Sequence, residues 1–138
     1  MNYVTEQLLN IVHDNKVSPD FNQWYLPVDK KGTTIAHIAA RYGCLPPDFD
    51  RWYLRNKDGW TVAHDAARYR LPLNFNQWEL TAKYGWTVAH IAASRGNLPP
   101  NFNQWEITDN DNKTVAEVAY INKRLPPNFD RWDLIERK

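Results

Sequence analysis

Three histidines stand at equivalent places in the chain and are the first candidates for chemistry. His37, His64 and His90 each follow a threonine by three residues, and no cysteine or carboxylate recurs beside them. Ligands that share a zinc ion lie ~2.0–2.1 Å from it, whereas equivalent residues of neighbouring helical units are ~10 Å apart. We therefore interpret each histidine as a structural residue, bonded to its threonine and to the backbone of a neighbouring loop. We expect no metal and no other cofactor.

The remaining side chains do not form a recognisable set of catalytic residues either. Cys44 is the only cysteine and has no recurring histidine or aspartate partner, which argues against a nucleophile. A lone cysteine also excludes a scaffold held by internal disulfides. No phosphate-binding glycine loop and no clustered acid–base pair is present. We expect no enzymatic activity.

Length and charge place the chain among ordinary single domains. It has 138 residues, with 17 Lys and Arg against 16 Asp and Glu, so a strongly basic, histone-like protein is excluded. The first sixteen residues lack the basic and apolar regions of a signal peptide. No apolar run approaches the ~18 residues of a membrane span. We expect a soluble, cytoplasmic protein with no membrane partner.

The elements that must position these side chains repeat along the chain. Five phenylalanines each precede a tryptophan by three residues, and a threonine series runs at matching intervals of 26 or 27 residues. The pairs are Phe21–Trp24, Phe49–Trp52, Phe75–Trp78, Phe102–Trp105 and Phe129–Trp132, and the threonines are Thr34, Thr61, Thr87 and Thr114. Repeats of this length are typical of a solenoid, in which each unit contacts only its neighbours.

Local signals predict two short helices in each unit. Thr34 is a suitable N-cap for a helix over 35–41, and Gly43 stands where a left-handed residue ends it. The two prolines at 46–47 open a second helix that ends near Trp52, followed by a turn. The recurring Phe and Trp residues are interpreted as core.

These signals divide the chain into five segments of one domain. We expect an N-terminal cap at 1–28 with a helix over 3–13, internal repeats at 29–55, 56–81 and 82–108, and a C-terminal cap repeat at 109–138. Asn112 replaces the turn glycine of the last repeat, and asparagine tolerates a positive φ there.

The pattern Gly-x-Thr-x-x-His-x-Ala-Ala-x-x-Gly-x-Leu, at 32–45, 85–98 and imperfectly at 59–71, resembles the first half of an ankyrin repeat. These units are shorter than the 33 residues of that family, and the Leu-Pro-Pro-x-Phe-x-x-Trp half is unusual. The resemblance implies an all-α fold: an α-solenoid of short helix–turn–helix, ankyrin-like repeats with capping units at both ends. The alternative is another helical-hairpin solenoid that converged on the same capping.

The resemblance also implies which positions vary and bind partners: the two before the turn glycine, the one after it, and the two after the Ala-Ala pair. We call these twenty positions the variable face. Its basic and aromatic members, predicted to bind a partner, are Lys30, Lys31, Arg41, Tyr42, Lys57, Trp60, Arg68, Tyr69, Lys83, Tyr84, Trp86, Arg95 and Lys113. Its other members are Thr33, Asp58, Ser94, Asn110, Asp111, Ile121 and Asn122. Eight basic and two acidic residues fall on this face, which leaves nine basic and fourteen acidic residues elsewhere.

Trp60 and Trp86 occupy identical positions in adjacent units and would form an apolar bar inside a basic rim. Tryptophan, tyrosine and arginine are enriched at binding hot spots. The alternatives are that both indoles pack between adjacent loops and that the basic residues form only a solvated face.

One unit departs from the pattern. Asp65 stands where the other units carry Ile38, Ile91 and Val118, and its unit lacks the glycine after the helix. A buried carboxylate requires a partner, for which Arg68 or Arg41 are candidates. The alternative is that this unit bends the stack and forms a local pocket.

The leading hypothesis is therefore a non-enzymatic protein-binding module, an adaptor or an inhibitor, whose partner carries an apolar patch with an acidic rim. The alternative is binding of nucleic acid or another polyanion through the same face. A purely structural stack, including an engineered one, is a further reading, which irregular unit lengths and the Asp65 unit disfavour.

Overall fold

The computed structural model describes residues 6, 7, 9, 10, 12, 14, 21–72 and 74–135. Within them the chain is helical: the α-helices are α2 (Ile35–Tyr42), α3 (Val62–Tyr69), α4 (Val88–Arg95) and α5 (Val115–Ile121), with 3₁₀ turns at Lys83–Gly85 and Trp132–Leu134 and no strand. The predicted helix over 3–13 lies partly outside the described residues, of which 6, 7, 9, 10 and 12 are helical.

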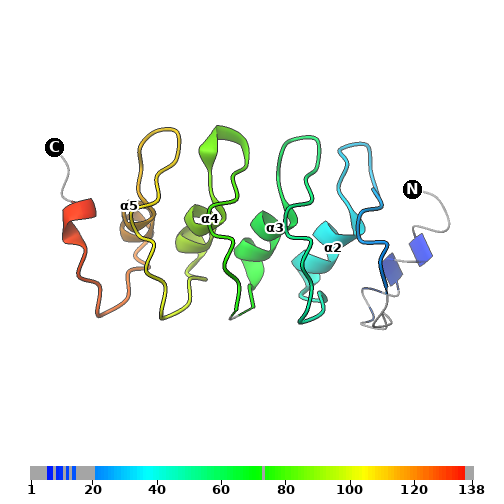
Figure 1. Ribbon diagram of the computed structural model, residues 1–138, viewed down its shortest axis with the longest axis horizontal. Helices are drawn as coiled ribbons and strands as arrows, with labels where there is room; N and C mark the ends of the chain where they lie inside the picture. Colours follow the sequence, from blue (N-terminus) through cyan, green and yellow to red (C-terminus); the bar gives the residue numbers. More distant parts are fainter. Residues whose placement is uncertain are drawn as a thin grey trace.

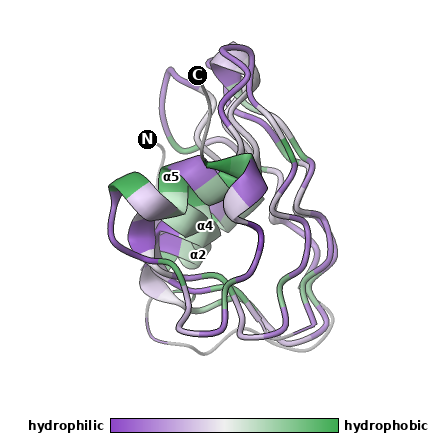
Figure 2. Ribbon diagram, turned by 90° about the vertical axis from the view of Figure 1, so that its left-hand side faces the viewer, coloured by the Kyte–Doolittle hydropathy of each residue, from purple (hydrophilic) through white to green (hydrophobic). Residues whose placement is uncertain are grey.

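The four α-helices lie side by side in chain order, with loops projecting from both ends of each unit (Figure 1). α2 packs on α3, α3 on α4 and α4 on α5. Viewed along the row, the helices superpose on one side and the connecting segments on the other (Figure 2). Each unit therefore buries its faces against its immediate neighbours.

Each helix begins where the preceding segment satisfies its first N–H groups. In α2, the N–H of Ile35 donates to the carbonyl of Leu26 (2.9 Å) and that of Ala36 to the carbonyl of Trp24 (3.1 Å). The hydroxyl of Thr34 accepts from the N–H of His37 (3.2 Å), as predicted for an N-cap. The same three bonds recur in α3, α4 and α5. The N–H groups of the first helical turn, which have no acceptor within the helix, are thus hydrogen-bonded in each of these four units.

The histidines join neighbouring units, which confirms their structural interpretation. In His37, Nδ1 lies 2.8 Å from the hydroxyl of Thr34, and Nε2 lies 2.9 Å from the carbonyl of Trp60 in the next unit. His64 and His90 form the same pair of contacts, to the carbonyls of Trp86 and Lys113. Because a carbonyl only accepts, Nε2 carries the proton and Nδ1 accepts from the hydroxyl.

The helix C-termini show how the irregular unit compensates for its missing glycine. Gly43 and Gly96 end α2 and α4 with φ of 69° and 74°. After α3 the extended Arg70 follows instead, and the carbonyl of Ala67 accepts from the side-chain amide of Asn97 in the next unit (2.8 Å). A side chain from one unit therefore satisfies the helix end of another.

The second helix predicted for each unit is wrong. The segment 46–52 forms a turn, closed by the N–H of Phe49 and the carbonyl of Pro46 (3.1 Å), and then runs without regular structure to Trp52. The second proline drives Pro46 away from helical geometry, and neither proline offers an N–H. In the unit where leucine follows Pro72, the N–H of Phe75 closes the same turn on the carbonyl of Pro72 (3.1 Å) without a second proline. Each unit consequently has one helix and one irregular return segment.

The Phe and Trp residues form one continuous ladder of edge-to-face rings, which confirms them as core. Centroid distances run between 4.6 and 5.5 Å, and neighbouring planes are inclined by 76–89°. The rings are buried except at the two ends, Phe21 and Trp132. This is the favoured arrangement of two aromatic quadrupoles.

Replacing one ring of the ladder should lower stability more than its volume alone predicts. Phe102 contacts Trp78 and Trp105 at centroid distances of 5.2 and 5.0 Å. We expect Phe102→Leu to lower the free energy of unfolding by about 2 kcal/mol, and Phe102→Ala by about 4 kcal/mol. Urea denaturation measures both, with the exposed Tyr53→Leu as the matched aromatic control. Equal stability of Phe102→Leu and wild type would contradict the ladder.

Acidification should destabilise the fold through its histidines. Burial lowers the pKa of His64 to about 4 from 6.5, and burial also lowers the pKa of His37 and His90. The unfolded chain therefore binds more protons between pH 6.5 and 4, so stability is lost as the pH falls through that range. His64 alone accounts for about 3 kcal/mol by pH 4.

The pKa of Asp65 is raised by burial and acts in the opposite sense, opposing part of this loss as the pH falls. Thermal unfolding at pH 7, 6, 5 and 4 measures the sum. A transition temperature that is constant from pH 7 to 5 would refute the neutral, buried state of the three rings.

Candidate functional site

The basic and aromatic members of the variable face are exposed with one exception, whereas Thr33 is buried and Ser94 is half-buried. Of its thirteen predicted binding residues, twelve have exposed side chains and only Trp60 is half-buried. Neighbouring loops are bonded to one another, since the N–H of Lys57 donates to the carbonyl of Lys31 (2.8 Å) and that of Asn110 to the carbonyl of Tyr84 (3.2 Å). The histidine bonds described above hold the backbone of Trp60, Trp86 and Lys113. The face therefore stands on a fixed backbone.

The structure separates the two tryptophans that were expected to form an apolar bar. The indole of Trp60 turns inward: its Nε1 donates to Asp65 Oδ1 (2.9 Å), and its ring lies 4.9 Å from that of His64. Trp86 remains 45% exposed. Packing thus accounts for Trp60, and the exposed indole is Trp86.

Asp65 contacts two residues of the variable face, Trp60 in the loop and Arg41 in α2. Its side chain is 1% exposed, and its Oδ2 lies 3.3 Å from Nε of Arg41. Of the two predicted arginine partners, Arg41 is thus confirmed, while Arg68 lies over the ring of Tyr69 (5.8 Å). Burial raises the pKa of Asp65, although Arg41 acts against this rise. The ion pair neutralises one positive charge of the face.

A hollow of about 320 Å³ opens on the variable face between α4 and α5. Trp86 and Ser94 line it from the unit of α4, and Val118 and Ile121 line it from α5. We did not predict this hollow. Its signal in the sequence is Ser94, which stands at the position that Arg41 occupies in α2, where a long side chain reaches across the junction.

One loop holds a second feature that the sequence analysis missed. The carboxylate or amide oxygens of Asp29, Asn56 and Asp109 each accept two backbone N–H groups and shape their loops. Ala82 stands in their place in the third loop and offers no such acceptor. There Tyr84 adopts a left-handed conformation, with φ of 67°, and its side chain is 69% exposed. Non-glycine residues seldom occupy this region, and those that do cluster at functional sites.

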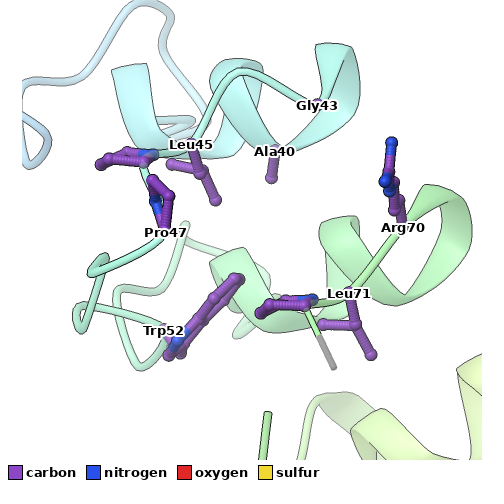
Figure 3. A pocket seen from close by; sticks show the side chains of 9 residues that line it. Ala40, Gly43, Leu45, Pro47, Trp52, Arg70 and Leu71 are labelled. Atoms are coloured by element: carbon purple, nitrogen blue, oxygen red, sulfur yellow. The ribbon is translucent and has the colours of Figure 1, made fainter. Parts of the chain in front are cut away.

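A different groove lies beside the segments that return from the helices. Figure 3 shows it between the ends of α2 and α3, where Leu45 faces Trp52 and Leu71, with Arg70 beside them. An equivalent groove recurs two units further on, beside Trp105 and Arg124. Because it recurs, the groove belongs to the repeated architecture and is not specific to the Asp65 unit.

Other kinds of site find no support in the described part of the chain. No three His, Cys, Asp or Glu side chains group there so as to hold a metal ion. None of its helices has the length and apolar character needed to cross a membrane. The chain matches no protein-family model, and no curated protein is significantly similar to it.

Removing the cation of Arg41 should destabilise the fold, because the buried carboxylate of Asp65 then loses its ion-pair partner. We expect Arg41→Met to lower the free energy of unfolding by about 2 kcal/mol at pH 7, since the carboxylate loses its cation while Arg41 itself is partly solvated. The double variant Arg41→Met, Asp65→Ile, which restores the residue type of the neighbouring units, should return to within about 1 kcal/mol of wild type. Urea denaturation of both variants measures this difference. If the double variant is no more stable than the single one, the ion pair is not what holds Arg41.

Proposed function

We propose that this chain is an α-solenoid of short, ankyrin-like repeats that binds another protein through the variable face. In this proposal it has no catalytic activity of its own and acts in the cytoplasm as an adaptor or an inhibitor. The threonine caps, the histidine links and the left-handed glycines support the ankyrin-like assignment. The irregular return segment, in place of a second helix, is this chain's departure from that pattern.

Exposed aromatic and aliphatic side chains on an ordered backbone are the observation that carries the proposal. Tyr42, Tyr69, Tyr84, Trp86 and Ile121 are all about half exposed or more. Their backbones are held by helices, by loop-to-loop bonds or by the histidine links, so little conformational entropy is lost when a partner binds them. Large apolar side chains with tyrosine, tryptophan and arginine among them are characteristic of protein interfaces.

The charge of the face favours a protein partner over nucleic acid. Arg41 is paired with Asp65, and Nζ of Lys83 lies over the ring of Tyr84 (5.8 Å). Asp111 and Asp58 interrupt the remaining basic residues. Phosphate binding by a chain of this size relies on several unpaired cations in a continuous track. The polyanion alternative therefore rests on fewer cations than the sequence count alone implies.

Affinity capture from a lysate of the source organism tests the proposal. Immobilised wild type, Trp86→Ala and the control Tyr53→Ala would be compared with and without nuclease. Trp86→Ala removes an exposed side chain but leaves the carbonyl that His64 binds, so its circular dichroism should match wild type. Trp60→Ala is unsuitable because it also removes the donor to Asp65.

We expect a protein to be retained by wild type and Tyr53→Ala, regardless of nuclease, and to be retained at least ten-fold less by Trp86→Ala. Retention that nuclease abolishes for all three variants would favour the polyanion alternative. Equal retention by all three, insensitive to nuclease, would move the binding site away from this face.

A further inference from the structure

The hollow beside Trp86 has the features of an anchor site for one side chain of the partner. This inference rests on the proposed function and specifies it further. The apolar part of the hollow's lining is accessible, since Trp86 is 45% and Ile121 63% exposed, and Val118 is half-buried. Exposed large apolar residues that converge on one hollow are unfavourable in water and gain most when an apolar group fills it.

Three polar side chains that line the hollow, Ser94, His90 and Asp109, are already hydrogen-bonded. Oγ of Ser94 donates to the carbonyl of Ile91 (2.7 Å), and Nε2 of His90 donates to the carbonyl of Lys113 (2.9 Å). Oδ1 of Asp109 accepts the N–H groups of Asp111 and Lys113 (2.9 and 3.0 Å). An occupant therefore meets mostly satisfied groups, which favours an apolar side chain over one that needs hydrogen bonds.

Charge around the hollow is unevenly distributed. The last loop lines it with Asp109, Asp111 and Lys113, so carboxylates outnumber cations there. Over the units that precede α5, the exposed cations of the face include Lys57, Arg68, Lys83 and Arg95, and Asp58 is the exposed carboxylate among them. Carboxylates of a bound segment are therefore favoured over those preceding units, where cations are in excess, and disfavoured at the last loop.

We propose that the hollow between α4 and α5 takes a single large apolar side chain from an acidic segment of the partner protein. The Asp and Glu residues of that segment lie on one side of the apolar anchor and run over the basic N-terminal part of the face. The anchor fills the space left by Ser94, where Arg41 in α2 reaches across to the next unit. Specificity for this segment therefore follows from one small residue, Ser94, at a position where α2 and α3 carry arginine.

The sharpest test exchanges residues between equivalent positions of the repeat. Ser94→Arg places in α4 the residue type that α2 and α3 carry there, and so fills the hollow with a side chain the repeat accepts. Ser94→Ala removes the hydroxyl, which bonds only within its own helix, and leaves the hollow open. Circular dichroism and urea denaturation would establish that both variants fold.

The probe is a random twelve-residue peptide library displayed on phage, selected on the wild-type chain. Recovered peptides would be synthesised, and their affinities measured by fluorescence anisotropy for wild type, Ser94→Arg, Ser94→Ala and Trp86→Ala. We expect peptides with one Leu, Ile, Met or Phe residue and acidic residues on one side of it. Their affinity should fall at least ten-fold with Ser94→Arg and Trp86→Ala, and should stay within two-fold for Ser94→Ala.

The remaining outcomes separate this inference from the proposed function. Peptides lost with Trp86→Ala but unaffected by Ser94→Arg would overturn the anchor site and leave the binding face standing. Peptides that depend on Ser94 but carry basic or no charged flanks would overturn the acidic segment. Recovery of no peptide, or only of peptides indifferent to both substitutions, would count against the anchor site and the face together.

Discussion

A single buried imidazole connects each unit to the next, and most of the structure depends on this contact. One ring nitrogen completes the threonine cap that starts the helix, while the other reaches the carbonyl of the following loop. The same ring therefore sets where a helix begins and where the next loop lies. That loop carbonyl belongs to Trp60, Trp86 or Lys113, all of which are variable-face positions. Neutral imidazole suits this role because it donates on one side and accepts on the other, which a lysine or a carboxylate cannot do.

The aromatic ladder supplies what such short units otherwise lack. Their helices are rich in alanine, which lets neighbours approach closely but buries little apolar area per residue. The return segments have no helix of their own to contribute. Edge-to-face Phe and Trp rings fill that volume and tie each return segment to the next, so the second half of a unit can remain irregular. A repeat of 26 or 27 residues is thus compatible with a continuous core.

Sequence reasoning succeeded where a residue recurs and failed where one unit differs from the others. The Thr34 cap, the histidine bonds, the buried Phe and Trp series and the positive φ of Asn112 (62°) all follow from repetition, because one physical explanation has to serve every copy. The predicted second helix was wrong, and at 46–47, 99–100 and 126–127 the second proline restricts the proline before it to non-helical geometry. The inward turn of Trp60 depends on Asp65, and the hollow depends on Ser94. Such effects come from residues that are peculiar to one unit, and no periodic pattern encodes them.

Those departures from the repeat also make the N-terminal and C-terminal ends of the variable face different from each other. Asp65 replaces an aliphatic residue and draws Arg41 and Trp60 toward the core, so the first junction loses a charge and an exposed indole. Ser94 replaces an arginine and leaves the last junction open between Trp86 and Ile121. One substitution therefore closes the face at its N-terminal end, and the other opens it at its C-terminal end. A stack of identical units would present the same surface at every step, and a partner could bind in several registers. In the proposed binding mode the apolar anchor enters the junction between α4 and α5, so the irregular units, and not the framework, set the register.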